Sequence, residues 1–184
     1  MTEPQFTEDW VTEHTGRWRM LLNDFAGQPH VHALEIGSYE GRSSIWFLEN
    51  ILTDPTSHLT CVDPFFRDVF VENLRPYESR VSWIRQYSHI ALRQLPLQSY
   101  SFAYVDGEHT APAVLEDAIM AFRSLVAGGI MIFDDYRWRS EHPDIRETMP
   151  GLGIDSFLSV FKREIEVLHK DYQVAVRKVK EPND

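Results

Sequence analysis

Acidic residues close several of the short apolar runs in this sequence, and side chains in such positions can bind cations and polar ligands. Together with one glycine, the residues at the ends of these runs are Glu35, Gly37, Asp63, Asp106, Asp134 and Asp135. In a doubly wound sheet, ligands bind outside the carboxyl ends of the parallel strands. We therefore expect these side chains to converge on one pocket. Ordinary turn formation is the alternative, since Asp is common where strands end in turns.

The segment 35–44 joins the first apolar run to a predicted helix and reads Glu-Ile-Gly-Ser-Tyr-Glu-Gly-Arg-Ser-Ser. Gly37 permits a tight turn and the close approach of a ligand, and Gly41 lets the helix begin against the strand. The spacing departs from the G-x-G-x-x-G pattern, so a pyrophosphate is less well accommodated. Asp63 follows Gly37 by 26 positions, about where an acid accepts hydrogen bonds from ribose hydroxyls. The turn thus predicts a ribose-containing ligand that lies against it without phosphates.

The elements that must position these residues alternate between short apolar runs and longer amphipathic ones. This alternation is typical of βαβ units around a parallel sheet. Gly128 and Gly129 are expected to cap the last helix of the series, because glycine readily adopts left-handed geometry. Strands are predicted at 31–36, 58–63, 80–86, 102–106 and 130–133, and helices at 43–52, 65–79 (irregular), 90–95 and 111–126.

Both ends of the chain add to this arrangement. Residues 7–26 have helical spacing and predict a helix that packs over the sheet or covers a pocket. Residues 155–161 are predicted to be helical, and 165–169 and 172–179 to form an antiparallel hairpin at the sheet edge with a tight turn at 170–171. The connection 136–152 is a predicted loop of a length that often serves as a functional cover.

The predicted fold class is therefore α/β. We expect a Rossmann-like, doubly wound, mostly parallel seven-stranded sheet with a C-terminal antiparallel hairpin. The 184 residues fit a single domain. Within it, 1–30 form an N-terminal helical segment and 31–180 the Rossmann-like core.

Composition limits the partners and the compartment. Lys and Arg number 18 against 28 Asp and Glu, and the net charge of −10 repels phosphate backbones. The basic cluster 177–180 is interpreted as a solvated strand end. Cys61, the single cysteine, lies in an apolar run, and a lone thiol favours a reducing compartment. The polar N-terminus and the lack of an apolar stretch of about 20 residues predict a cytoplasmic protein with neither nucleic-acid nor membrane partners.

Three segments resemble motifs of class I S-adenosylmethionine-dependent methyltransferases. The run 34–43 is similar to the first motif of that superfamily, and 104–109 and 128–136 resemble later motifs of a small bacterial group within it. This group is related to catechol O-methyltransferase and to the O-methyltransferases of macrolide and aminocoumarin sugars. The order Asp-Gly-x-His and then Gly-Gly…Asp-Asp is fairly specific to the group, whereas the glycine turn is shared across the superfamily. The likeness covers about residues 33–179.

The resemblance implies S-adenosylmethionine as the cofactor. Asp63 would hold the ribose and Ser88 would lie beside the adenine, although the segment around Ser88 matches poorly. The methionine part would contact the residues at 35 and 37–39. The full set of implied cofactor contacts is Glu35, Gly37, Ser38, Tyr39, Gly41, Asp63, Ser88 and Asp106.

Metal-dependent relatives bind Mg²⁺ through acidic or amide side chains, which the resemblance places here at Asp106, Asp134 and Asp135. Hard oxygen ligands suit Mg²⁺, and three carboxylates that share one pocket repel each other without a cation. The metal would lower the pKa of an acceptor hydroxyl and align its oxygen with the methyl group. His109 and Glu108, close to Asp106, are the candidate bases. His109 stands where catechol-type relatives carry a catalytic lysine, and a neutral His accepts a proton near pH 7.

The predicted function is metal-assisted O-methylation of a small phenol- or sugar-like hydroxyl acceptor, with Trp138, Tyr136 and Arg137 as candidates to line its pocket. One alternative is metal-independent N- or C-methylation with His109 or Glu108 as base, and another is a module that binds S-adenosylmethionine without turnover. A dehydrogenase is disfavoured by the missing third glycine. His109 as a structural hydrogen-bonding group, and 134–135 as a cap of the following loop, also stay open. A homodimer through the hairpin or the N-terminal helix is a further expectation.

Overall fold

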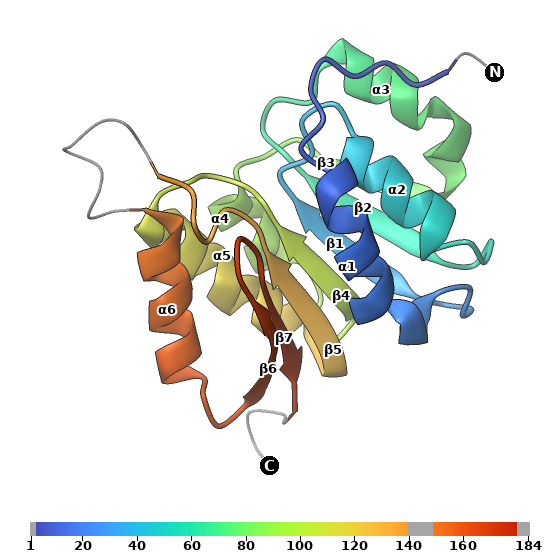
Figure 1. Cartoon of the computed structure of the whole chain (residues 1–184). Helices are drawn as coiled ribbons and strands as arrows, with labels where there is room; N and C mark the ends of the chain where they lie inside the picture. Colours follow the sequence, from blue (N-terminus) through green and yellow to red (C-terminus); the bar gives the residue numbers. More distant parts are fainter. Residues whose placement is uncertain (1–2, 140–148, 180–184) are drawn as a thin grey trace.

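A seven-stranded sheet forms the centre of the molecule (Figure 1). The computed structural model describes residues 3–139 and 149–179. The strand order is β3-β2-β1-β4-β5-β7-β6, in which β1 to β5 are parallel and β7 is antiparallel to both of its neighbours. The predicted Rossmann-like sheet with a C-terminal antiparallel hairpin is confirmed. The strands are β1 (His32–Ile36), β2 (His58–Val62), β3 (Val81–Ile84), β4 (Tyr100–Val105), β5 (Leu125–Phe133), β6 (Ile165–Lys170) and β7 (Val174–Lys178).

Helices cover both faces of the sheet, and each face has its own cluster of buried apolar side chains (Figure 1). On one face lie α1 (Thr15–Leu21), α2 (Arg42–Asn50) and α3 (Asp68–Leu74), and on the other α4 (Ser88–Ala91), α5 (Ala111–Ser124) and α6 (Pro150–Val160). Short 3₁₀ turns adjoin them at η1 (Thr12–His14), η2 (Asn23–Phe25), η3 (Arg75–Arg80) and η4 (Leu92–Gln94). In the described ranges, no helix has the length and apolar character that crossing a membrane requires.

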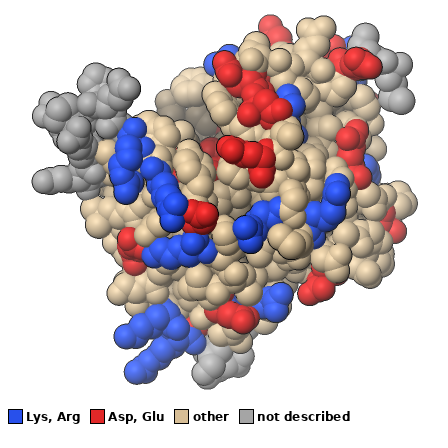
Figure 2. Space-filling view, in the orientation of Figure 1, with Lys and Arg blue, Asp and Glu red and all other residues tan. Residues whose placement is uncertain are grey.

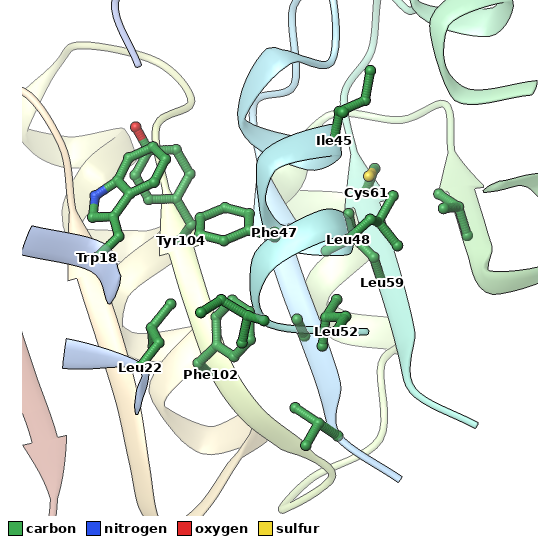
Figure 3. Packing of buried hydrophobic residues seen from close by; sticks show 14 of the residues in the cluster. Trp18, Leu22, Ile45, Phe47, Leu48, Leu52, Leu59, Cys61, Phe102 and Tyr104 are labelled. Carbon is green, nitrogen blue, oxygen red and sulfur yellow. The ribbon is translucent and has the colours of Figure 1, made fainter. Parts of the chain in front are cut away.

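Trp18 anchors the N-terminal segment in the core of the first face. Its ring packs beside Phe47 and Tyr104, with centroid distances of 5.0 Å and 5.1 Å (Figure 3). The indole Nε1 donates a hydrogen bond of 2.8 Å to the side-chain oxygen of Gln173, so the one polar atom of this buried ring is satisfied. Trp18 thereby joins the N-terminal segment both to β4 and to the turn before β7.

The N-terminal helix is shorter than the predicted 7–26. Only Thr15–Leu21 is α-helical, with η1 before it and η2 after it. The residues before η1 instead make hydrogen bonds to side chains elsewhere in the chain, such as that from the Thr7 amide to Glu40. These contacts compete with helix formation, because they already use backbone groups that a helix would pair internally.

The expectation that Gly128 and Gly129 cap the preceding helix is wrong. Helix α5 ends at Ser124, and β5 begins at the next residue without an intervening loop. Gly128 has a φ of +81° inside β5, where the pairing with β4 shifts register between Tyr100 and Phe102. The glycine thus serves an irregularity in the strand.

Two expectations about the C-terminal third also need correction. The predicted loop 136–152 is shorter at its end, because α6 already begins at Pro150, which suits the first turn of a helix; residues 140–148 lie outside the described part of the chain. Lys178 is not a solvated strand end. It is 1% exposed, and its ammonium group donates a 2.7 Å hydrogen bond to the carbonyl of Leu125. Lys180 lies outside the described residues.

The strand order reverses between β1 and β4. From β1 the chain builds outward through β2 and β3, and it then returns to place β4 on the other side of β1. At such a switch point the loops that follow the two central strands diverge and leave a crevice for a ligand. The residues that follow β1 and β4 are therefore the ones that the fold brings to the crevice.

Candidate functional site

A cavity of about 790 Å³ opens at the carboxyl ends of β1, β2, β4 and β5, beneath the N-terminal segment. Two of the residues predicted for the site, Glu35 and Gly41, do not line it. The structure thus brings most of the predicted residues to one cavity and separates them from two that lie behind its wall. The predicted residues in the wall are Gly37, Ser38, Tyr39, Asp63, Ser88, Asp106, Glu108, His109, Asp134 and Asp135.

Gly37 is required by the close approach of two strand ends. Its φ is +82°, and a Cβ at this position would lie 1.9 Å from the carbonyl oxygen of Asp106. The Asp106 amide donates a 2.8 Å hydrogen bond to the carbonyl of Ile36, which holds the end of β4 against the turn. The sequence suggested this glycine for turn geometry and ligand approach, and contact with β4 is a further reason that only the structure shows.

Gly41 has a different neighbour from the one expected. It precedes α2 with a φ of +81°, and a Cβ here would lie 2.3 Å from the side chain of Leu74 and 3.1 Å from that of Phe70. Both residues belong to α3. Helix α2 begins directly after Gly41, and α3 is the element that a side chain at this position would meet.

The carboxylate of Glu35 is fully buried beneath the turn and is surrounded by donors. Hydroxyl groups of Ser38 (3.0 Å), Ser43 (2.5 Å) and Ser44 donate to it, as does the thiol of Cys61 (3.3 Å). Burial raises the pKa of Glu35, and these hydrogen bonds oppose that rise. In this arrangement Glu35 fixes the turn and the start of α2, and its predicted contact with the methionine part of a cofactor stays a prediction.

Asp63 reaches across from the end of β2 to the same turn. One carboxylate oxygen accepts hydrogen bonds from the amides of Ser38 (3.0 Å) and Tyr39 (3.4 Å), and the other accepts one from the amide of Phe65 (2.7 Å). Tyr39 has a φ of +45°, which is uncommon for a bulky residue and is held here by its surroundings. Asp63 therefore organises the turn as well as lining the cavity.

The N-terminal segment covers part of the cavity through contacts that the sequence did not reveal. The amide and hydroxyl of Thr7 donate to the two carboxylate oxygens of Glu40, at 2.7 Å and 2.8 Å. Asn73 exchanges two hydrogen bonds with the backbone of Gln5, at 2.9 Å and 2.8 Å. Glu40 and Asn73 are 4% and 5% exposed. The segment contributes Phe6, Glu8, Trp10, Val11, Glu13 and His14 to the cavity wall.

At the ends of β4 and β5, three ionisable side chains come together. The imidazole Nε2 of His109 lies 3.0 Å from a carboxylate oxygen of Asp135 and 3.7 Å from one of Asp106. One ligand atom from each of the three lies within 4.8 Å of the others. The neighbouring carboxylates of Asp106 and Asp135 raise the pKa of His109 to about 10, so the imidazole carries a proton at neutral pH. Burial, together with the charges of neighbouring carboxylates, raises the pKa of Asp106.

Asp134 is predicted as a metal ligand, but its oxygens are engaged in other contacts. The hydroxyl of Tyr104 and the side-chain amide of Gln173 (3.0 Å) donate to one oxygen, and the amide of Asp135 (2.7 Å) donates to the other. Tyr104 is 2% exposed and Gln173 3%. The geometry therefore groups His109, rather than Asp134, with the other two carboxylates, although Asp134 still lines the cavity.

The remaining wall of the cavity is aromatic. The ring of Trp138 lies 5.2 Å from that of His109, and the ring of Tyr172 stacks with His14 at 5.8 Å. Of the three residues predicted to line an acceptor pocket, only Trp138 lies in this wall. Tyr136 instead contacts Asp155 and Lys170, and Arg137 pairs with Asp171 at 2.5 Å.

The charge around the cavity is mainly acidic. In its described wall, Arg42 and Arg67 are the only Lys or Arg residues. Arg42 pairs with Asp9 at 2.7 Å, and the guanidinium group of Arg67 lies over the ring of Tyr39, 4.3 Å from its centroid. On the face shown in Figure 2, Asp and Glu side chains cluster in the upper middle, while Lys and Arg side chains lie mostly to the left and below. The cavity therefore favours cationic ligands over anionic ones.

Comparison with known proteins adds a family assignment. Residues 34–136, more than half of the chain, match the methyltransferase domain family. No curated protein matches the sequence. Three solved structures show how widely the fold recurs, at sequence identities that establish a shared fold and nothing finer.

The first is the MycE methyltransferase from the mycinamycin biosynthetic pathway, in complex with Mg, SAH and mycinamycin VI. It has a TM-score of 0.69 at 16% identity, covering 94% of this chain and 51% of that one, so this chain spans about half its length. A putative caffeoyl-CoA O-methyltransferase from Staphylococcus aureus has a TM-score of 0.69 at 14% identity, covering 94% and 86%. The 1,6-didemethyltoxoflavin-N1-methyltransferase from Burkholderia thailandensis, with S-adenosylhomocysteine, has a TM-score of 0.61 at 13% identity, covering 97% and 100%.

Proposed function

Because the chain belongs to the methyltransferase domain family, we propose that it uses S-adenosylmethionine to methylate a hydroxyl oxygen of a small acceptor with the help of a divalent cation. One observation carries the proposal. A single cavity is lined both by the turn after β1 with Asp63 and by the group formed by Asp106, His109 and Asp135. A methyl donor and a hydroxyl acceptor therefore fit side by side.

The cofactor would occupy the half of the cavity near β1 and β2. Asp63 lies at the end of β2, where an acidic side chain accepts hydrogen bonds from ribose hydroxyls. The methionine part would lie against the turn at Gly37 and Ser38. Its sulfonium would then face the carboxylates that follow β4 and β5, and an acidic wall stabilises that positive charge. The methyl group would point toward the acceptor side of the cavity.

The residues present fit a divalent cation. Asp106 and Asp135 offer oxygen atoms close together, and their mutual repulsion favours a bound cation. These two would hold a Mg²⁺ ion, with the nearby Asp134 as the further candidate ligand. When bound, the ion would lower the pKa of the acceptor hydroxyl.

The structure also indicates which residue could act as the base that removes the proton from the hydroxyl group to be methylated. An imidazole that carries a proton at neutral pH cannot accept another, so His109 in this arrangement is the counter-charge of Asp106 and Asp135. Glu108 also lines the cavity, and its carboxylate accepts a 3.1 Å hydrogen bond from the hydroxyl of Thr110. We therefore propose Glu108 as the base and the aromatic wall at Trp138 as the surface that orients the acceptor.

Methyl transfer from labelled S-adenosylmethionine to a panel of phenols and sugars tests this proposal. We expect transfer with Mg²⁺ and its loss in EDTA. Asp135→Asn should lower the rate about 100-fold, in the range found when one group that stabilises a transition state is removed. Asp155→Asn is the control, because Asp155 pairs with Lys170 outside the cavity. Transfer that persists unchanged in EDTA would exclude metal assistance, and failure to bind S-adenosylhomocysteine in calorimetry would contradict the cofactor assignment.

Metal-independent methylation of a nitrogen is the second candidate. The specific observation in its favour is that His109 already neutralises part of the acidic group, while both oxygens of Asp134 are hydrogen-bonded within the chain. A nitrogen nucleophile with a free electron pair needs less activation than a hydroxyl does. A parallel panel of amines and nitrogen heterocycles, assayed in EDTA, distinguishes the two candidates.

A further inference from the structure

Asp117 carries a buried carboxylate oxygen, Oδ2, that has no hydrogen-bond partner. The residue lies in α5 and is 1% exposed. Among the described residues, no other buried side-chain nitrogen or oxygen is left without a partner. Burying an unpaired polar group is unfavourable. Because this unpaired oxygen destabilises the fold, we expect Asp117 Oδ2 to accept a hydrogen bond from a ligand.

The open acceptor lies at the wall of the cavity already described. Asp117 lines that cavity, as do Ser88 at the start of α4 and Gly107 after β4. A Cβ at Gly107 would lie 3.3 Å from Asp117 Oδ2, so the glycine leaves space directly beside the carboxylate. The hydroxyl of Ser88 is close enough to lower the pKa of Asp117 through a hydrogen bond. Ser88 and Asp117 thus form a polar corner between α4 and α5.

The position of this corner selects one part of the cofactor, and this step rests on the proposed function. Asp63 marks the ribose at the end of β2, and the reacting methyl group must face the carboxylates after β4 and β5. The base on the other side of the ribose must then extend toward the elements that follow β3, where α4 begins at Ser88. Adenine presents a 6-amino group as a donor on its outer edge. A carboxylate oxygen without a partner is the complementary acceptor.

We infer that Asp117, with Ser88 beside it, recognises the amino edge of the cofactor's adenine, with Asp117 Oδ2 accepting a hydrogen bond from the 6-amino group. Burial raises the pKa of Asp117 to about 6, so at pH 8 the carboxylate is ionised and acts only as an acceptor. A nucleobase with a carbonyl oxygen in place of the amino group would set one hydrogen-bond acceptor against another, the carboxylate oxygen of Asp117. The site therefore selects an adenosyl over an inosyl group.

The test compares two ligands that differ only at this edge. Calorimetry at pH 8 measures the affinities of S-adenosylhomocysteine and S-inosylhomocysteine, in which a carbonyl oxygen replaces the amino group. We expect the unaltered protein to prefer the adenosyl compound by about 30-fold or more, because a buried polar group left unpaired weakens binding strongly. Asp117→Asn presents an amide that can donate to the carbonyl oxygen, so the preference should fall at least about tenfold. Asp155→Asn should keep the full preference.

The ratio of the affinities for the two ligands is measured on one folded protein, so a loss of folded protein in a variant does not change it. If Asp117→Asn does not fold, Ser88→Ala and the unaltered protein still give the ratio, and Ser88→Ala should reduce it. Equal binding of both ligands by the unaltered protein would overturn the inference. So would an unchanged ratio in Asp117→Asn, which would mean that a water molecule satisfies Oδ2. If neither ligand binds, the proposed function fails as well, whereas binding without preference contradicts only the adenine inference.

Discussion

The turn after β1 and the ends of β4 and β5 both carry acidic side chains, but the two regions differ in how the carboxylates are satisfied. Beneath the turn, Glu35 accepts hydrogen bonds from three hydroxyls and a thiol of its own chain. At the strand ends, Asp106 and Asp135 share one imidazole across 3.7 Å and 3.0 Å. The comparison suggests a division of roles, in which the first region is complete before a ligand arrives and the second is completed by one.

The strongest test of this comparison is Gly37→Ala. The new Cβ would meet the Asp106 carbonyl at a φ of +82°, which alanine does not readily adopt. We expect a loss of about 3 kcal/mol or more in the free energy of unfolding, measured in urea, and the loss of binding to S-adenosylhomocysteine. Gly16→Ala is the matched control, since nothing lies within 4 Å of its Cβ and the residue is in α1. It should leave the stability unchanged or raise it slightly. Similar effects of the two substitutions would show that the turn is not preformed.

Removing one charge from each region sharpens the contrast. Glu35→Gln replaces one carboxylate oxygen, which accepts hydrogen bonds, with an NH₂ group. This group would face the hydroxyl and thiol donors that surround the side chain. We expect a loss of about 2 kcal/mol in the free energy of unfolding. Asp106→Asn relieves repulsion among neighbouring carboxylates and should leave that free energy unchanged or raise it by up to about 1 kcal/mol. Both are measured by urea denaturation at pH 8 in EDTA. Equal losses would contradict the difference between the regions.

The smallest expected effect is a dependence on pH at the strand ends, because the His109 side chain is 40% exposed and water screens its ion pairs. The folded pKa of His109 is raised from 6.5 to about 10. The stability that this imidazole contributes is therefore fully present below pH 6.5 and is lost as the pH rises toward 10. In EDTA, the stability difference between the unaltered protein and His109→Gln should shrink from pH 6 to pH 10. A difference that grows with pH would mean that His109 is buried in its neutral form.

The sequence predicted the sheet and most of the residues at the edge that faces the cavity, because both leave local signals. Short apolar runs that end in Asp63, Asp106 and Asp134 specify strands and place polar groups at their carboxyl ends. The helix cap predicted at Gly128 failed for a local reason as well. Helix α5 passes directly into β5, and two adjoining elements without a turn between them leave no signal at the boundary.

The composition of the site was harder to predict, because it depends on distances between side chains. Position in the sequence makes Asp134 and Asp135 equivalent, yet Tyr104 and Gln173 bind the first and leave the second to His109. Asp117 looks like any polar residue on an amphipathic helix until its burial is known. A buried carboxylate oxygen without a partner can be recognised only in three dimensions.

Tyr104 has a consequence for how acceptor preference can change in descendants of this protein. Its ring packs against Trp18 in the core while its hydroxyl donates to Asp134. A substitution of Tyr104 would therefore disturb the packing of the core as well as the cavity. Glu8, Trp10 and Glu13 line the same cavity but lie outside the buried apolar core. New acceptors are therefore most readily acquired by altering this covering segment, and the sheet can remain constant while the enzyme diversifies.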